Sequence, residues 1–232
     1  MTTKNSIKQG HVTPTQPIAC LAALALLAAS CTGALAVETA TVKPEEALKR
    51  LQDGNERFVA GTPTQTTKDA KRRAEVAQGQ KPFAIIVSCS DSRVGPEVVF
   101  DQGLGDIFVT RTAGHVVDDV GLGSIEYAVE HLGATLILVL GHERCGAVAA
   151  TVAGGEAHGH VRAIVKAIQP AVTKTKGQPG DAVDNAVRAQ VSAVVRQLQQ
   201  AEPILAERVK AGKIKVAGAR YDLDTGKVEV LE

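Results

Sequence analysis

The chain has 232 residues, 44% of them apolar, which is long enough for one α/β domain with a buried core. Its formal net charge of +1 argues against electrostatic capture of nucleic acid or of an anionic membrane surface. Aromatic residues make up 3% of the chain and Trp is absent, which argues against a platform on which bases or sugars stack.

The first 36 residues follow the order of a secretory signal. A weakly basic start precedes an uncharged run rich in Ala and Leu, from Ile18 to Ala29. Ala34-Leu35-Ala36 then places small residues two apart, as at a signal cleavage site. We therefore predict that residues 1–36 are a signal peptide and that residues 37–232 form one periplasmic or secreted domain.

Two alternatives for this segment stay open. The apolar run is short for a membrane-spanning helix, but it could remain as an uncleaved anchor. Cys31 follows Ala28 and two further small residues, so it could be the lipidated cysteine of a lipoprotein, although such signals usually have Leu where Ala28 stands. Unless Cys31 is lipidated, no membrane association is expected.

Apolar periodicity predicts alternating helices and strands in the remaining chain. In chain order the predicted elements are helix Pro44–Val59, helix Asp69–Gln78, strand Phe83–Val87, strand Ile107–Val109, helix Gly121–Leu132, strand Thr135–Leu140, helix Cys145–Val152, helix His160–Ile168, helix Ala182–Ala201, and a closing pair of strands, Lys215–Leu223 and Lys227–Leu231. Strands that alternate with helices, and that are apolar throughout, predict a mainly parallel sheet in a single α/β domain.

Polar, cysteine-containing motifs follow two of the buried strands. Cys89, Asp91 and Arg93 come after the first of them, and His142 and Cys145 come after the third. Because ligands gather at the carboxyl ends of strands in such sheets, the two motifs are expected to face each other. The sequence contains four cysteines, and cleavage after Ala36 would leave only Cys89 and Cys145. In an oxidising compartment these two could form a disulfide instead of binding a metal.

Cysteine and histidine together are typical zinc ligands. His142 and Cys145 are three residues apart, which suits the first turn of a helix, and a fourth donor could be Asp91 or water. Asp91 and Arg93 are two apart, so they point the same way in an extended segment and can form a bidentate ion pair. A carboxylate that leaves the metal for an arginine would open a position for water, as in a catalytic zinc site.

The sequence closely resembles the β-class carbonic anhydrase family from about Ala47 to its end. The motifs that carry the resemblance are Gly54-Asn55-Glu56-Arg57-Phe58-Val59, Cys89-Ser90-Asp91-Ser92-Arg93, Gly105-Asp106-Ile107-Phe108-Val109-Thr110-Arg111, Ser124-Ile125-Glu126-Tyr127-Ala128-Val129 and Gly141-His142 through Cys145-Gly146. One departure is Thr112, where the family commonly has Asn after the Arg. His115, which follows shortly afterwards, is unexplained.

The resemblance implies a role for each matching residue. Cys89, His142 and Cys145 would bind Zn²⁺, and Asp91 with Arg93 would control the fourth position, with Asp91 able to bind the metal itself. The remaining matches are a catalytic and substrate-binding glutamine, three further pocket residues and a candidate proton shuttle: Gln80, then Phe108, Tyr127 and Gly146, then His131.

The family resemblance also implies a fold, an assembly and a reaction. The expected fold is a sheet of four parallel strands plus an antiparallel edge strand, flanked by helices, with an N-terminal helical arm. The expected assembly is a homodimer, or a larger oligomer built on it, with pocket residues shared across the interface. The expected reaction is reversible hydration of carbon dioxide to bicarbonate and a proton, by attack of a metal hydroxide.

Two other functions fit parts of the pattern. The same site could hydrolyse carbonyl sulfide or carbon disulfide, since pocket width decides between these small substrates. A non-catalytic zinc-binding or redox-sensing module is the other alternative. The presence of Asp91, Arg93 and Gln80 argues against that module, because a structural zinc site needs neither a displaceable ligand nor a substrate donor.

Overall fold

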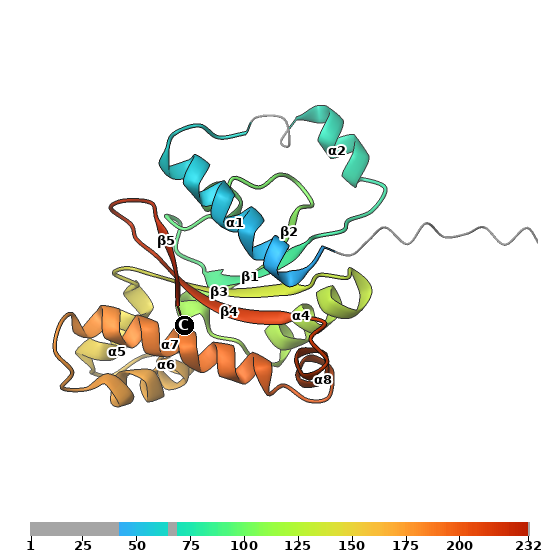
Figure 1. Ribbon diagram of the computed structural model, residues 1–232. Helices are drawn as coiled ribbons and strands as arrows, with labels where there is room; N and C mark the ends of the chain where they lie inside the picture. The colour runs from blue at the N-terminus through green and yellow to red at the C-terminus, as the bar shows by residue number, and fades with distance from the viewer. Residues whose placement is uncertain (1–41, 65–68, 232) are drawn as a thin grey trace, which may run out of the picture. The chain divides into compact units, whose positions relative to one another are not determined.

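The computed structural model describes residues 42–64 and 69–231 (Figure 1). The predicted signal peptide, residues 1–36, lies outside these described residues. Within the described ranges, no helix has the length and apolar character needed to cross a membrane.

The strands of the described chain form one five-stranded sheet in the order β2-β1-β3-β4-β5. Strands β1 to β4 pair in parallel and β5 pairs antiparallel with β4, which confirms the predicted sheet. The strand bounds are β1 Ala84–Cys89, β2 Ile107–Thr112, β3 Leu136–His142, β4 Lys215–Tyr221 and β5 Val228–Leu231.

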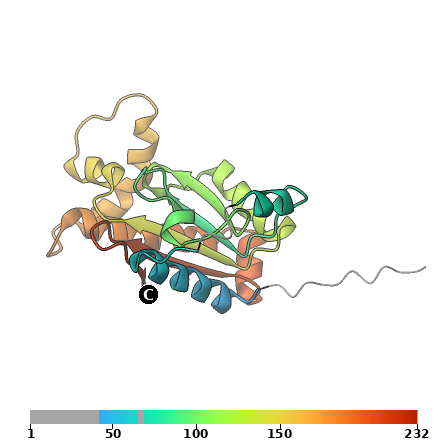
Figure 2. The same cartoon turned by 90° about the horizontal axis from the view of Figure 1, so that it is seen from above.

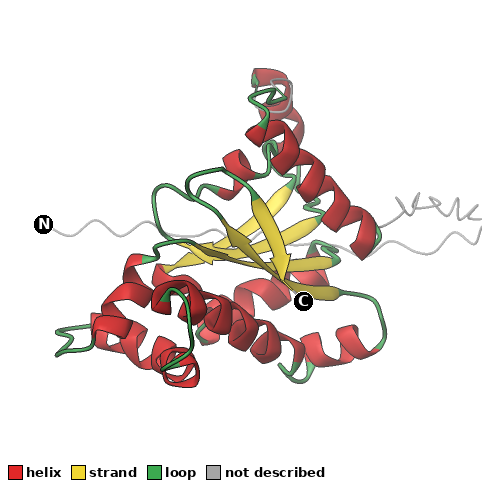
Figure 3. Ribbon diagram, turned by 60° about the vertical axis from the view of Figure 1, so that its left-hand side comes forward, coloured by secondary structure: helices red, strands yellow, loops and turns green. Residues whose placement is uncertain are grey.

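Helices cover both faces of this sheet (Figures 1 and 3). The helix bounds are α1 Pro44–Val59, α2 Ala70–Val76, α3 Pro96–Val99, α4 Asp119–His131, α5 Gly146–Ala153, α6 Val161–Thr175, α7 Ala182–Gln199 and α8 Ile204–Lys210, with a single 3₁₀ turn η1 at Ala113–His115. Helix α1 lies over one face, while α4, α7 and α8 lie under the other. Figure 2 shows α5 and α6 beside the end of the sheet at which β3 leads into α5.

The core explains why the central strands are apolar throughout. Successive side chains of a strand point to opposite faces, so Ile86 and Leu138 pack toward α1 while Ile85 and Ile137 pack toward α4 and α7. Every residue of β1 and β3 is buried. The buried strands β1 and β3 therefore hold the residues at the carboxyl edge of the sheet in place.

Most sequence predictions agree with the structure to within a few residues at each end. Helix α1 has the predicted bounds, whereas α6 continues through Pro170 to Thr175, beyond the predicted end at Ile168. The short helices α3 and α8 were not predicted. They have four and seven residues, too few for a 3.6-residue repeat to stand out in the sequence.

Candidate metal centre

Three metal-binding side chains meet at the carboxyl edge of the sheet. Cys89 ends β1, His142 ends β3, and Cys145 is the N-cap residue of α5. Their ligand atoms all lie within 4.8 Å of one another, and all three residues are buried. The structure thus brings together the three residues predicted as metal ligands.

The geometry of these donors fits a tetrahedral zinc ion. Two sulfur ligands at the usual zinc–sulfur bond length stand about 3.8 Å apart in a tetrahedron. The Sγ atoms of Cys89 and Cys145 are 3.9 Å apart, and both residues are free thiols. A disulfide would need the sulfurs at about 2.05 Å, so the described arrangement is that of a metal site and not of the alternative disulfide.

His142 presents its second ring nitrogen to the same space. Its Nδ1 lies 2.8 Å from the carbonyl oxygen of Glu143, a bond in which Nδ1–H donates. Nε2 is then the unprotonated nitrogen, and it is buried without a hydrogen-bond partner in the described structure. A buried acceptor costs free energy when it is left unpaired, so a metal at this point would supply the partner that Nε2 lacks.

The contact between the two thiols favours loss of the Cys89 proton. The pKa of Cys89 lies well below its ordinary value because the Cys145 thiol and the backbone N–H of Gly114 donate toward its sulfur. The same contact with Cys89 raises the pKa of Cys145, so the pair shares one proton. A divalent cation would displace that proton and leave two thiolates.

Asp91 lies beside this group but is held by Arg93. Its Oδ1 accepts from the backbone N–H and from Nε of Arg93 at 3.0 and 2.9 Å, and its Oδ2 accepts from an Nη of Arg93 at 2.8 Å. The Arg93 guanidinium holds the pKa of Asp91 far below its usual range. Oδ2 stands 3.8 Å from Nε2 of His142, so Asp91 faces the metal position without belonging to the three-residue group.

Two residues whose contacts the sequence did not predict support the segment from Cys89 to Asp91. Arg111, near the end of β2, donates from Nε to the carbonyl oxygen of Cys89 at 2.8 Å and from an Nη to that of Asp91 at 2.6 Å. Gly114 has a φ of 71° and donates its N–H to the Cys89 sulfur at 3.3 Å. The position of Arg111 at the carboxyl end of a predicted strand was the available signal.

His115 is fully buried next to these residues, and neither of its ring nitrogens has a hydrogen-bond partner in the described structure. Burial lowers the pKa of His115 to about 4, so its imidazole is neutral at physiological pH. Its φ of 45° lies in the left-handed region, which is uncommon outside glycine. His115 does not belong to the ligand group.

The substrate-side residues do not converge on the metal group within one chain. Gln80 is exposed and precedes β1, and β1 spans roughly 20 Å before it reaches Cys89. Phe108 lies half-buried near the start of β2. Tyr127 and His131 are exposed on α4 with ring centroids 5.1 Å apart, on the part of the helix that leads back toward the start of β3.

Two glycines shape the immediate surroundings. A Cβ on Gly141, just before His142, would come within 2.6 Å of a Val191 methyl group of α7. Only glycine lets α7 pack this closely against β3. A Cβ on Gly146, the predicted pocket residue after Cys145, would meet nothing within 4 Å, so this residue borders open space.

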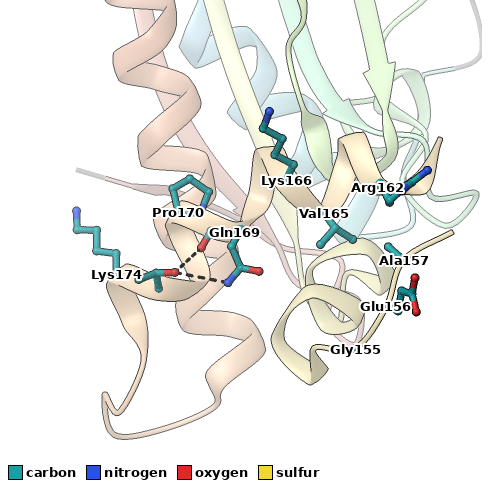
Figure 4. Close-up of a pocket in the computed structure, with 10 residues that line it drawn as sticks. Gly155, Glu156, Ala157, Arg162, Val165, Lys166, Gln169, Pro170 and Lys174 are labelled. Carbon is teal, nitrogen blue, oxygen red and sulfur yellow. Dashed lines mark hydrogen bonds between the residues drawn. The ribbon is translucent and has the colours of Figure 1, made fainter. Parts of the chain in front are cut away.

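An open groove of about 960 Å³ lies elsewhere on the surface (Figure 4). Its lining comes from α6 and from the loop that precedes it, including Val165, Lys166 and Pro170. None of the residues that line it belongs to the metal group or to the other predicted site residues. The groove is therefore separate from the candidate metal centre.

Comparison with known proteins places this site among carbonic anhydrases. The family described as carbonic anhydrase matches residues 84–228. The chain is 45% identical over 188 residues to carbonic anhydrase 2 of Mycobacterium tuberculosis, which covers 79% of this chain and 91% of that protein. It is also 45% identical over 191 residues to the carbonic anhydrase of Mycolicibacterium smegmatis, covering 81% and 93% of the two chains.

Solved structures agree in fold. The β-carbonic anhydrase of Coccomyxa, solved in complex with acetazolamide, superposes with a TM-score of 0.65 at 28% identity, over 79% of this chain and 86% of that one. A tetrameric β-carbonic anhydrase of Sordaria macrospora gives a TM-score of 0.64 at 25% identity, over 68% of this chain and 85% of that one.

Proposed function

The chain belongs to the β-carbonic anhydrase family, and on that premise we propose that it binds one zinc ion and interconverts carbon dioxide and bicarbonate. The observation that carries the proposal is the buried group of Cys89, His142 and Cys145, whose donor atoms have the spacing of a three-ligand zinc site. Three protein ligands leave one position open, which is the arrangement of catalytic rather than structural zinc.

The residues of the chain around that ion would have different roles. Bound zinc would lower the pKa of water and supply hydroxide as a nucleophile. Arg93 keeps the Asp91 carboxylate engaged and so leaves the open position to the reactants. The Cys89 and Cys145 thiolates would neutralise the positive charge of the zinc ion. Water at such a site is less acidic than at a site with only histidine ligands, so activity is expected to favour alkaline pH.

The substrate side of the pocket requires a second copy of the chain in this proposal. Gln80, Phe108, Tyr127 and His131 lie away from the metal group of their own chain, and the family likeness assigns such residues to a shared interface. The Sordaria relatives are described as tetrameric, which supports a dimer-based oligomer here. Light scattering should find a dimer or larger; a fully active monomer would contradict this assignment.

Hydration of carbon dioxide is favoured over hydrolysis of carbonyl sulfide or carbon disulfide because the most similar relatives cited above are named carbonic anhydrases. We predict that purified, zinc-loaded protein accelerates carbon dioxide hydration far above the buffer rate. The same preparation should hydrolyse the two sulfur compounds much more slowly. The reverse order of rates would establish the sulfur-compound hydrolase, and inactivity toward all three would favour a non-catalytic zinc or redox module.

We also propose that the protein is exported and that its signal is removed after Ala36, on the strength of the apolar run and Ala34-Leu35-Ala36. The exported protein is then expected to begin at Val37 and to be recovered from the periplasm or the medium. Its intact mass measures this directly. A mass that includes the first 36 residues, or a lipid on Cys31, would show an anchored protein instead.

A further inference from the structure

We propose that Glu143 and Arg220 are positioning residues for the metal group, because their ion pair fixes the turn that connects His142 to Cys145. The inference rests on the proposed function, since it concerns how the same ligands are held. The juxtaposition that carries it joins three segments far apart in the sequence: the turn after β3, the end of β4 and the first turn of α7.

The turn itself is short and conformationally unusual. Glu143 and Arg144 are the two residues between the two ligands, and Arg144 has a φ of 48°, in the left-handed region. The carbonyl oxygen of Glu143 accepts the hydrogen bond that fixes the ring of His142. Rotation of the Glu143 peptide would therefore turn Nε2 of His142 away from the metal position and shift the start of α5, where Cys145 lies.

Glu143 binds the neighbouring strand β4 and the residues after it through both its backbone and its side chain. The backbone N–H of Glu143 donates to the carbonyl oxygen of Tyr221 at 3.0 Å, and the Glu143 carboxylate accepts from the N–H of Leu223 at 3.1 Å. The other carboxylate oxygen pairs with Arg220 at 3.1 Å. Glu143 is thereby fixed at both its backbone and its side chain to the segment that ends β4.

Arg220 is in turn held by an ion pair with the first turn of α7. Its side chain is 11% exposed, against 20% for Glu143, and its Nε donates to Asp184 in the first turn of α7. Asp184 also accepts from Arg188, which pairs with Glu229 of β5. Because the side chains of Arg220, Glu143 and Asp184 are mostly shielded from solvent by protein, their geometry is defined more tightly than that of a surface pair.

A second ion pair on the same turn offers a matched control. Arg144 pairs with Asp224 through two bonds of 2.8 and 2.7 Å, but the side chains are 54% and 69% exposed. Exposed pairs contribute little, so this contact is expected to matter far less than Glu143–Arg220. The carboxylates of Glu143, Asp222 and Asp224 lie close together. Arg144 and Arg220 pair with these carboxylates and balance their negative charge.

The test measures metal binding rather than activity. Zinc affinity would be determined by competition with a chromogenic chelator for the unchanged full chain and for Glu143→Gln, Arg220→Lys and Asp224→Asn. Glu143→Gln and Arg220→Lys should each weaken zinc binding by about 10- to 100-fold, the usual effect of losing a group that orients a metal ligand. Asp224→Asn should bind zinc as the unchanged protein does.

The visible spectrum of the Co²⁺-loaded proteins separates positioning from general stability. The two positioning variants should show altered ligand-field bands, because His142 is no longer held in one orientation, while a merely structural role would lower the melting temperature and leave the bands unchanged. Unaltered zinc affinity and spectra in both variants would overturn the inference. If the unchanged protein binds zinc but does not hydrate carbon dioxide, the proposed function fails, and the affinities still decide the role of Glu143 and Arg220.

Discussion

Replacing Arg93 with Ala should reduce carbon dioxide hydration by roughly 100-fold or more while zinc remains bound, an effect comparable to losing one strong transition-state contact. The reason lies in the three hydrogen bonds that Arg93 donates to Asp91, two of them from the side chain. Without that side chain, the Asp91 carboxylate is left 3.8 Å from the ligand nitrogen of His142. It should then take the fourth zinc position and exclude water from it.

Three variants make this prediction specific. Arg93→Lys should recover only part of the activity, because an ammonium cannot form the bidentate pair. Adding Asp91→Ala to Arg93→Ala should restore activity relative to Arg93→Ala alone, since the blocking carboxylate is then gone. Arg162→Ala removes the same charge from an exposed position of α6 and should have no effect. If Arg93→Ala keeps near-normal hydration with zinc bound, Asp91 and Arg93 form only a structural ion pair.

Replacing Cys145 with Ser should abolish both stoichiometric zinc binding and hydration. Cys145 is fully buried and supplies one of three donor atoms, and a hydroxyl does not replace a thiolate as a zinc ligand. Metal analysis of the purified variant should find little zinc after dialysis, and the hydration rate should fall to that of the buffer.

Ser88→Ala is the matched control for this change. Ser88 precedes Cys89 and is fully buried, and its hydroxyl has no hydrogen-bond partner in the described structure. Removing that hydroxyl should leave zinc content unchanged and should not lower stability, because an unpaired buried polar group is lost. Full zinc in Cys145→Ser would show that the metal, if present, is held by other residues.

The candidate metal ligands could be predicted because each lies at the end of a buried strand or just after it. Continuous apolar runs located β1 and β3, and the rule that sites form at carboxyl edges joined Cys89 to His142 and Cys145. The polar ends of these strands were missed: Ser88 and Cys89 continue β1 because they pair with Arg111 and Thr112 of β2. Strand pairing, and not apolar pattern, decides where such a strand ends.

The contacts that hold the turn between His142 and Cys145 could not be predicted in the same way. Glu143 and Arg220 lie in different elements, and no local pattern links two charged residues whose contact depends on how β3, β4 and α7 pack. The positions of Gln80 and Tyr127 show a second limit. Their motifs match the family, yet the described chain does not bring them to the metal group, and we propose that this contact forms between two copies of the chain.

We propose that zinc held by Cys89, His142 and Cys145 produces carbon dioxide hydration. The most direct test is a titration of the chelator-treated protein with zinc, in which metal content and the initial rate of carbon dioxide hydration are measured on the same samples. The rate should rise in proportion to zinc and level off at about one ion per chain, the capacity of a single three-ligand site. Hydration that is independent of zinc, or its absence at one zinc per chain, would contradict the claim.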